Sequence, residues 1–579
     1  MRFNKECRYI GIFAPVFALR TDQDLGVGDV SGLIEMIEWC GAQRLNILQI
    51  LPINETSGDN SPYNVISSQA LDITTLSFRL GNIPGHRPSD IKALISAEAL
   101  DDLNTGVVKY SDVKKLKWQL CRKAYKRWKK TREEVEVFDR FCEEQHWLQN
   151  YACFRSLMKI YNSSPAWMEW DSTHQTPQDL GEWLNRLNIK NRELFATDCE
   201  FYAFVQWCLY RQWDMVRAAA EKHEVGLMGD IPFGVSRSSV DVWAQPDLFS
   251  SKWSGGAPPE PLFATDEFTI KWGQNWGVPV YQWDKHREED FAWWKARIKG
   301  VTRFFDLFRL DHVLGFYRIY AFPWPPEENS NFTNQTREEV EVSLGALPQF
   351  LPSSDETEEG RRINQAQGEE LLSVVLKAAG DAVVVAEDLG MVPEYVRPSL
   401  EKLGISGFRI PVFTRQEWDQ EYVAPESYPS LTFTTLSTHD HHTMAQMWEN
   451  WWSVFEQADQ FEEGEEKQKC IQASWELYRT LRFAKMNDGE LVRKYSPNVH
   501  HNMIARLMGS NSWLVVLMVT DLFDWDIRFN VPGPAADSNW SVRVPLSVKE
   551  LQIEAGVIDC MKLLKKEMIY SNRLHEKSA

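Results

Sequence analysis

The sequence has few of the features that mark secreted, disulfide-stapled or membrane-spanning proteins. Its nine cysteines are an odd number, scattered over 579 residues without a C-x-x-C pair. This argues against a disulfide framework and a zinc site, and it favours a reducing, cytoplasmic location. No run approaches the roughly 20 apolar residues that span a bilayer, so no membrane association is expected. Residues 1–19 begin like a signal peptide but have no small-residue cleavage site, and we interpret the stretch as a first barrel strand.

Positive charge is also scarce. The net charge is −19, with no sustained basic stripe. Nucleic acid is therefore excluded as a partner, because phosphate contacts supply most of such affinity. The one basic segment, 114–127, flanks an apolar stripe at helical spacing, and we interpret it as the solvated face of a helix rather than a polyanion site. The stripe consists of Val113, Leu116, Leu120 and Ala124.

Aromatic residues, in contrast, are abundant. The chain has 25 tryptophans, 30 phenylalanines and 17 tyrosines within an otherwise ordinary composition of 43% hydrophobic and 25% charged residues. Indole faces stack on sugar rings, but aromatic residues mostly serve cores. We therefore expect core packing to account for most of them.

Short apolar runs that end in polar residues recur along the chain, separated by segments of helical periodicity. The runs are Ile10–Val16, Leu45–Leu51, Val225–Asp230, Phe305–Asp311, Ala382–Glu387, Gly407–Phe413, Leu431–Asp440 and Trp513–Asp521. Eight such strands are the number that closes a (β/α)8 TIM barrel, the α/β fold class that we predict.

The predicted domain organisation is a single catalytic barrel over residues 1–579. A largely helical insertion is expected at 55–222, and a second insertion at 312–382. The polar segment 353–370 is expected to be a loop that enters a helix. No separate C-terminal β domain is expected.

Three carboxylates each follow an apolar run. Asp311 lies in FRLDHVLGF, Glu387 in VVVAEDLG and Asp440 in TFTTLSTHDHH. The C-terminal ends of barrel strands are where such barrels carry their catalytic groups. Glycosidic bond cleavage uses two carboxyl groups for covalent and proton chemistry, and a third can hold the distorted sugar. The pattern thus indicates glycosidic chemistry.

Each carboxylate also has a structural interpretation. Arg309 shares a strand face with Asp311 and stabilises the ionised form that a nucleophile needs, but the pair is equally typical of a structural ion pair. Glu387 in an apolar rim has the raised pKa of an acid, or else caps a helix with Asp388. The three histidines around Asp440 suggest a metal site, but no fourth donor is in view. We therefore predict no metal and no cofactor.

Further segments accompany these motifs in order. They are FALRTDQDLGVGD (17–29), ILQILPIN (47–54), SPYNVIS (61–67), GDIPFGVSRSSVDVWAQPDLF (229–249), GAPPEPLF (256–263), GQNWGVPVYQW (273–283), and FNVPG followed by NW (529–540). With them, the chain resembles the 4-α-glucanotransferases (amylomaltase, or disproportionating enzyme), glycoside hydrolase family 77 of the α-amylase clan. The resemblance runs from near residue 10 to near residue 545.

The resemblance implies Asp311 as nucleophile, Glu387 as general acid/base and Asp440 as transition-state stabiliser. The residues that it places around the sugar are Tyr63, Asp230, Arg309, His312 and His439 on the donor side, and Trp276 towards the acceptor. The family is retaining and needs no metal, so the two reacting carboxyls should lie about 5–5.5 Å apart. Maltose, malto-oligosaccharides, glycogen and related α-glucans are the implied partners. The oligomeric state stays open.

Some positions depart from the family pattern. Val278 stands where Asn is usual, His441 and His442 replace Asn-Asp, and residues 265–272 are extra. With these departures, the chain is more similar to the plant-cytosolic and related bacterial branch of the family. Two alternatives remain: a retaining α-glucan hydrolase of the same clan, and a catalytically silent glycan-binding protein.

Overall fold

The computed structural model describes residues 3–260, 266–487, 489, 493–532 and 538–575. Parts of three sequence segments discussed above, at 261–263, 265 and 533, therefore lie outside the described residues. One sheet contains eight strands in the order β10-β11-β12-β1-β2-β3-β6-β9, and all its ladders are parallel. The strands are β1 (Tyr9–Phe13), β2 (Ile47–Gln49), β3 (Gly226–Ile231), β6 (Leu307–Leu310), β9 (Val383–Ala386), β10 (Gly407–Arg409), β11 (Thr432–Thr434) and β12 (Leu514–Met518).

The sheet closes on itself between β9 and β10. Val385 forms a parallel bridge with Ser406, and the Ala386 N–H donates to the Ser406 carbonyl at 2.8 Å. Each of the eight predicted runs overlaps one strand, which confirms the barrel. Seven of the eight strands are shorter than their runs. In the run Gly407–Phe413, for example, the strand ends at Arg409 and Pro411–Phe413 forms a 3-10 turn, η8.

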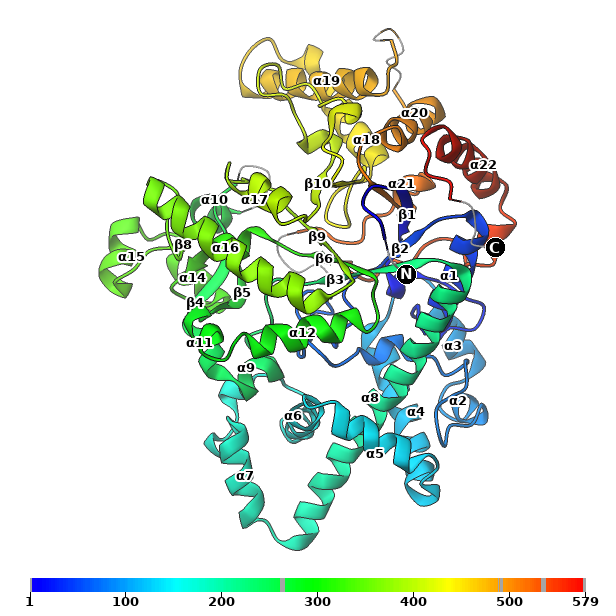
Figure 1. Cartoon of the computed structure of the whole chain (residues 1–579), viewed down its shortest axis with the longest axis vertical. Helices are drawn as coiled ribbons and strands as arrows, with labels where there is room; N and C mark the ends of the chain where they lie inside the picture. The colour runs from blue at the N-terminus through cyan, green and yellow to red at the C-terminus, as the bar shows by residue number, and fades with distance from the viewer. Residues whose placement is uncertain (1–2, 261–265, 488, 490–492, 533–537, 576–579) are drawn as a thin grey trace.

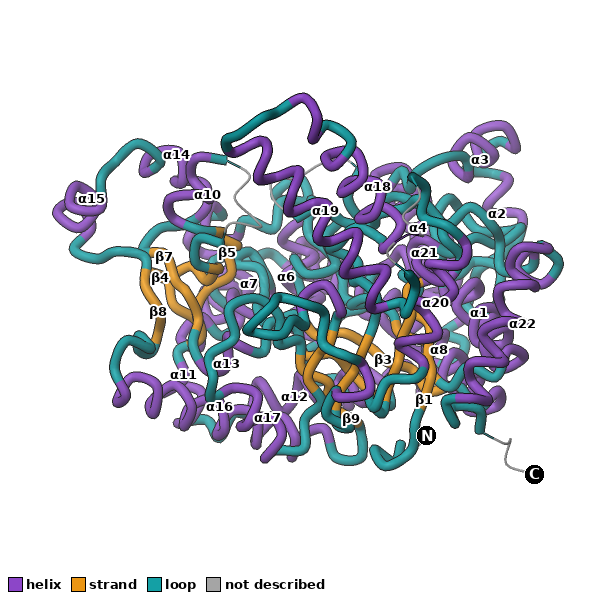
Figure 2. The backbone as a smooth tube through the Cα atoms, turned by 90° about the horizontal axis from the view of Figure 1, so that it is seen from above, coloured by secondary structure: helices purple, strands orange, loops and turns teal. Residues whose placement is uncertain are grey.

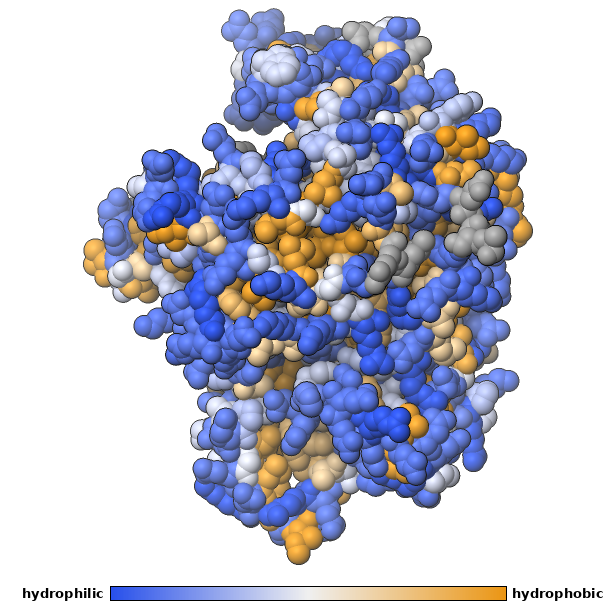
Figure 3. All heavy atoms as spheres, in the orientation of Figure 1, coloured by the Kyte–Doolittle hydropathy of each residue, from blue (hydrophilic) through white to orange (hydrophobic). Residues whose placement is uncertain are grey.

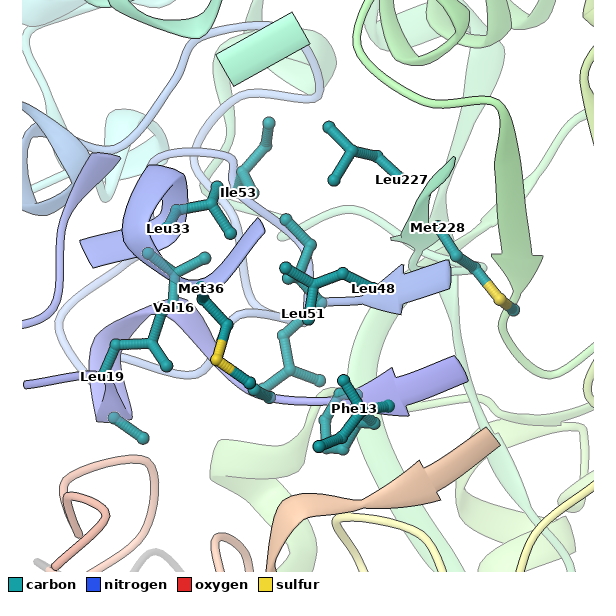
Figure 4. Close-up of a cluster of buried hydrophobic side chains, with 14 of the residues drawn as sticks. Phe13, Val16, Leu19, Leu33, Met36, Leu48, Leu51, Ile53, Leu227 and Met228 are labelled. Carbon is teal, nitrogen blue, oxygen red and sulfur yellow. The ribbon is translucent and has the colours of Figure 1, made fainter. Parts of the chain in front are cut away.

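Most side chains of the barrel strands are apolar and buried, because helices cover the outside. Figure 4 shows a cluster of buried apolar side chains from β1, β2, β3, α1 (Val30–Gln43) and the turn that precedes α1. Its labelled members include Phe13, Val16, Leu33, Met36, Leu48, Leu227 and Met228. Inside the barrel, Phe408 and Phe433 stack with ring centroids 4.2 Å apart.

Helices form most of the chain between β2 and β3. They are α2 (Ser89–Lys92), α3 (Ala97–Asn104), α4 (Tyr110–Thr131), α5 (Val135–Glu144), α6 (Leu148–Ile160), α7 (Pro177–Arg186) and α8 (Ile189–His223). Figure 1 shows α5 to α8 in the lower part of the molecule. Figure 3 shows a mostly hydrophilic face, with apolar residues near its centre and at the lower tip.

The prediction that the basic segment is a solvated helix face is wrong for Lys117, which lies on α4. Lys117 is fully buried, and its Nζ donates to the Leu76 carbonyl at 2.8 Å and also to the Thr74 carbonyl. Its Nζ also lies 3.8 Å from Oδ2 of the buried Asp29. A buried ammonium group requires such partners, and they come from a segment far from α4 in the sequence.

A second, antiparallel sheet has the strand order β5-β4-β7-β8 and was not predicted. Its strands are β4 (Phe249–Ala257), β5 (Gln274–Tyr281), β7 (Ile319–Phe322) and β8 (Gln349–Leu351). Figure 2 shows it beside the barrel, among α10 (Glu267–Trp272), α14 (Asn329–Phe332) and α15 (Arg337–Leu344). The stacked rings of Trp324 and Phe332, with centroids 4.2 Å apart, lie in the small core of this sheet.

The remaining helices complete the shell. They are α9 (Val240–Ala244), α11 (Trp283–Glu288), α12 (Ala292–Thr302), α13 (Leu314–Tyr317), α16 (Glu358–Ala379), α17 (Val396–Lys402), α18 (Met444–Phe455), α19 (Glu465–Phe483), α20 (Pro497–Met508), α21 (Val519–Leu522) and α22 (Ala555–Tyr570). The loop expected at 353–370 is short, because α16 begins at Glu358 with Thr357 as its N-cap. Among the described residues, every helix is too short or too polar to cross a membrane.

Candidate active site

The barrel places the three carboxylates at the C-terminal ends of its strands. Asp311 directly follows β6 and Glu387 directly follows β9, while Asp440 lies in the loop after β11. The ladder continues past the strand ends, since the Asp311 N–H donates to the Ile231 carbonyl and the Glu387 N–H to the Leu310 carbonyl, both at 3.0 Å. Register therefore sets the first two carboxylates side by side at one rim of the barrel.

Arg309 lies at the centre of the site. Its Nη1 is 2.7 Å from Oδ1 of Asp311 and 2.8 Å from Oδ2 of Asp230, the residue opposite it on β3. Its Nη2 is 3.8 Å from Oε2 of Glu387. Burial alone would lower the pKa of Arg309, but the carboxylates of Asp230 and Asp311 raise it above the ordinary value. One fixed cation thus compensates several acidic side chains at the rim.

Two backbone N–H groups hold the carboxyl group of Glu387. His312 donates to Oε2 and Leu389 to Oε1, both at 2.9 Å. No helix begins here, since the next one, α17, starts at Val396, so the helix-cap interpretation is wrong for Glu387. Burial raises its pKa to about 7, and the charge of Asp311 adds to this against the opposing effect of Arg309. Glu387 is therefore partly protonated near neutral pH, the state in which a carboxyl group can give a proton.

His312 occupies the turn between Asp311 and the start of α13. Its φ of 44° lies in the left-handed region, which is uncommon for a residue with a side chain. Burial lowers the pKa of its imidazole to about 4, so the ring is neutral at physiological pH. The Trp276 ring meets it edge-on at 4.7 Å and is itself 39% exposed. The structure thus brings these two predicted residues together beside the carboxylates.

Asp440, His439, Tyr63 and Asp230 form a connected chain of contacts. His439 Nε2 lies 3.2 Å from Asp440 Oδ2 and 3.0 Å from the Tyr63 hydroxyl. The same hydroxyl donates to Asp230 Oδ2 at 2.7 Å, and the Tyr63 and His439 rings stack at 5.4 Å. Burial raises the pKa of Asp230 to about 6, although Arg309 opposes the shift. All nine predicted site residues therefore lie in one network of contacts.

Two further residues hold Asp440 in place, and the sequence analysis did not single them out. Asn530 Nδ2 donates to Asp440 Oδ1, and Arg528 Nη2 to the Asp440 carbonyl, both at 2.6 Å. Burial would raise the pKa of Asp440, but His439 and the Asn530 hydrogen bond bring it far below the usual range. The only sequence signal was that Asn530 belongs to the FNVPG segment.

The positions that depart from the family pattern have local roles. A Cβ atom on Gly234 would lie 2.7 Å from Val278, so Val278 packs closely against that backbone. His441 Nδ1 lies 2.7 Å from Thr438 Oγ1, while His442 Nε2 lies 3.0 Å from Arg528 Nη1. The histidines around Asp440 thus have separate partners, and no group of three metal-ligating side chains occurs in the described residues.

The site is open to the barrel mouth but closed beneath. The side chain of Asp440 is 33% exposed, that of Asp311 25% and that of Glu387 11%. Under them, a cavity of about 20 Å³ lined by Arg309, Phe408 and other interior residues has room for about one water molecule. A ligand therefore reaches these carboxylates from outside. A protonated acid beside an ion-paired carboxylate is the pair that retaining glycoside cleavage uses.

Comparison with known proteins identifies relatives along most of the chain. A family model described as 4-alpha-glucanotransferase (glycoside hydrolase 77) matches residues 14–548. The chain is 32% identical to the 4-alpha-glucanotransferase of Chlamydia caviae over 550 residues, which is 93% of this chain and 91% of that protein. It is 34% identical over 322 residues to the 4-alpha-glucanotransferase DPE2 of Oryza sativa subsp. japonica, which covers 55% of this chain and 32% of that protein.

Solved structures share the fold. The amylomaltase of Streptococcus agalactiae, solved in complex with acarbose, superposes with a TM-score of 0.72 at 21% identity and covers 98% of this chain and 100% of its own. The amylomaltase of Corynebacterium glutamicum gives a TM-score of 0.74 at 18% identity, over 96% of this chain and 75% of its own.

Proposed function

Because the chain belongs to the glycoside hydrolase 77 family of 4-alpha-glucanotransferases and is such an enzyme, we propose that Asp311, Glu387 and Asp440 carry its reaction. The observation that carries the proposal is the contrast around Arg309. Its guanidinium pairs with Asp311 at 2.7 Å, whereas burial raises the pKa of neighbouring Glu387 to about 7. One carboxyl is thereby ready to attack and the other to give a proton.

In the first step, a carboxylate oxygen of Asp311 attacks the anomeric carbon of the donor sugar. The bond from that carbon to the glycosidic oxygen breaks, and Glu387 gives its proton to the departing oxygen. The product is a covalent glucosyl-enzyme and a shortened glucan. Arg309 stays paired with the Asp230 carboxylate throughout, which keeps positive charge beside the reacting group.

In the second step, the Glu387 carboxylate takes the proton of an acceptor hydroxyl. That oxygen attacks the anomeric carbon, the bond to Asp311 breaks, and a new α-1,4 bond forms with retention. Asp440 and His439, 3.2 Å apart, hold adjacent hydroxyls of the distorted sugar. Transfer prevails over hydrolysis when the acceptor, bound near Trp276, excludes water during this step.

The proposed donors are maltose and malto-oligosaccharides, and the proposed acceptors are glycogen and related α-glucans. We propose that the whole chain, 1–579, acts as one catalytic unit with insertions at 55–222 and 312–382. A cytoplasmic location is also part of the proposal. It is supported by the nine cysteines, which are all free, as is typical of a reducing compartment.

Product analysis tests the reaction. Purified protein is incubated with maltotriose, or with maltose with and without glycogen, while glucose, longer oligomers and total reducing ends are followed. Longer oligomers at constant reducing ends support transfer. Rising reducing ends without longer oligomers would instead make the protein a hydrolase, and no change would revive the silent glycan-binding alternative.

The roles of the carboxylates are tested with an activated glucosyl fluoride, whose leaving group needs no acid. Glu387→Gln should accumulate the covalent adduct, because its nucleophile is intact but its second step lacks a base. Asp311→Asn should form no adduct. If the intact mass of the Glu387→Gln protein shows no adduct, the assigned roles of Asp311 and Glu387 are contradicted.

A further inference from the structure

The loop after β10 folds into a small hairpin, residues 413–423. Arg415 and Tyr422 form an antiparallel bridge, and the Gln416 N–H donates to the Glu421 carbonyl at 2.9 Å. At the tip stands Trp418, with 79% of its surface exposed. An indole that is this exposed on an ordered backbone is available to stack on a ligand.

Helix α19 holds the hairpin rigidly. Both Arg415 terminal nitrogens donate to Glu476, at 2.8 and 3.0 Å, and the Tyr422 hydroxyl donates to the same carboxylate at 2.8 Å. A second ion pair joins Glu421 to Arg482, with Nε to Oε2 at 2.9 Å. Figure 1 shows α19 at the top of the molecule, above β10. A fixed hairpin loses little freedom when a ligand binds to it.

The other end of the hairpin reaches the active site. Phe413 is 40% exposed, and its ring lies 4.8 Å from the ring of His441, the residue after Asp440. Trp418 follows Phe413 by five positions, so the two lie no more than about 17 Å apart along an extended strand. The hairpin therefore continues the surface of the catalytic rim outwards.

We propose that this hairpin is an outer binding site for long α-glucan chains, with Trp418 as its stacking surface. The inference rests on the proposed function, because the occupant is the substrate of the same enzyme. Exposed side chains of Glu417, Asp419 and Gln420 surround the indole and accept or donate hydrogen bonds to hydroxyl groups. An acidic tip excludes a polyanion but suits a neutral polyol.

This site distinguishes substrates by length. A short donor such as maltotriose fills the catalytic rim without reaching Trp418, whereas a branch of glycogen spans both. Removing the indole should therefore weaken glycogen binding and leave the reaction of maltotriose unchanged.

The test compares wild type with Trp418→Ala in native gels containing increasing glycogen, which gives a dissociation constant, and in disproportionation of maltotriose. We expect about fivefold weaker glycogen binding for the variant and an unchanged maltotriose rate. Trp418→Phe, which keeps a ring, should lie in between. The matched control is Tyr570→Ala, because Tyr570 at the end of α22 is 83% exposed and remote in sequence from the hairpin.

Equal glycogen affinity for wild type and Trp418→Ala would overturn the proposal. So would an equal loss for Tyr570→Ala, or a maltotriose rate that falls as much as glycogen binding. Failure of the proposed function would show differently, as a wild type that makes no longer oligomers from maltotriose while the glycogen gels remain readable.

Discussion

Nη1 of Arg309 lies 2.7 Å from Oδ1 of Asp311. Arg309 lies in β6 and Asp311 directly follows it, so their side chains, two positions apart, are on the same face of the strand. The sequence allowed either a catalytic or a structural role for this pair. The structure adds Asp230 at 2.8 Å from the same nitrogen. One guanidinium thus pairs with two carboxylates at the rim, and this arrangement supports the catalytic role that we propose.

Replacing Arg309 with Met should lower kcat/KM for maltotriose by at least about 100-fold, because the charge that compensates Asp230 and Asp311 is lost. Initial rates measured at equal concentrations of folded protein provide the check. Arg362→Met is the matched control, since Arg362 is an exposed arginine on α16 that pairs with Glu359. Equal rates for Arg309→Met and Arg362→Met would contradict a role at the site.

The raised pKa of Glu387, about 7, sets a limit on activity at alkaline pH. Only the protonated form gives a proton to the leaving oxygen, so kcat/KM for maltotriose should fall about tenfold per pH unit above about pH 7. With glucosyl fluoride as donor, formation of the adduct needs no acid, and this decline should disappear. A decline that persists with the fluoride would show that another group controls it.

The Tyr63 hydroxyl connects Asp230 at 2.7 Å with His439 at 3.0 Å. Tyr63→Phe keeps the ring that the family resemblance places against the sugar but removes this link, so we expect kcat to fall about tenfold with little change in KM. Tyr63→Ala should raise KM as well, because the ring is lost too. Steady-state kinetics of both variants separate the two contributions; a rise in KM alone for Tyr63→Phe would refute the role of the hydroxyl.

The eight strands and the three carboxylates were predictable because their signals are local. An apolar run followed by Asp or Glu marks both the strand and the residue at its C-terminal end, as at Asp311 and Glu387. The second sheet has no such signal. Its strand β4 pairs with β5 through two register shifts, and β5 contains Pro279, which weakens the strand pattern.

Contacts between distant segments could not be read from periodicity either. Helical spacing placed Lys117 beside an apolar stripe, but the carbonyl groups that accept its hydrogen bonds belong to Thr74 and Leu76, more than forty residues earlier. Asn530 orients Asp440 from 90 residues away. Such partners follow from the closed barrel, which brings strand ends together, and not from local sequence.

Arg573, after the end of α22, closes the opposite, N-terminal end of the barrel. Its side chain is fully buried and donates to the carbonyl groups of Tyr9, Met508, Ser510, Ser512 and Trp513. Arg573→Met should lower the free energy of unfolding by at least about 3 kcal/mol, because several buried carbonyls lose their donor. Urea unfolding measures this, while kcat of the folded fraction should stay unchanged. Wild-type stability for the variant would show that water replaces the guanidinium.

His286 on α11 is fully buried among the rings of Phe249, Tyr281 and Trp293. Burial lowers its pKa from 6.5 to about 4, so the folded protein holds it neutral while the unfolded chain protonates below about pH 6.5. Unfolding then takes up a proton, and the stability that the neutral ring contributes is lost as pH falls from 6.5 towards 4.

His286→Phe removes this titration and keeps an apolar ring in the same pocket. Between pH 6.5 and 5, the variant should therefore gain about 2 kcal/mol relative to wild type, at up to about 1.4 kcal/mol per pH unit. The quantity to compare is the difference in stability between variant and wild type. Glu387 and Asp230, with pKa values raised to about 7 and 6, add stability as pH falls, but they do so equally in both proteins, so their effect cancels in this difference. Urea unfolding at several pH values measures it, with His146→Phe at an exposed position as control. A constant difference across this range would mean that His286 accepts a proton in the folded state.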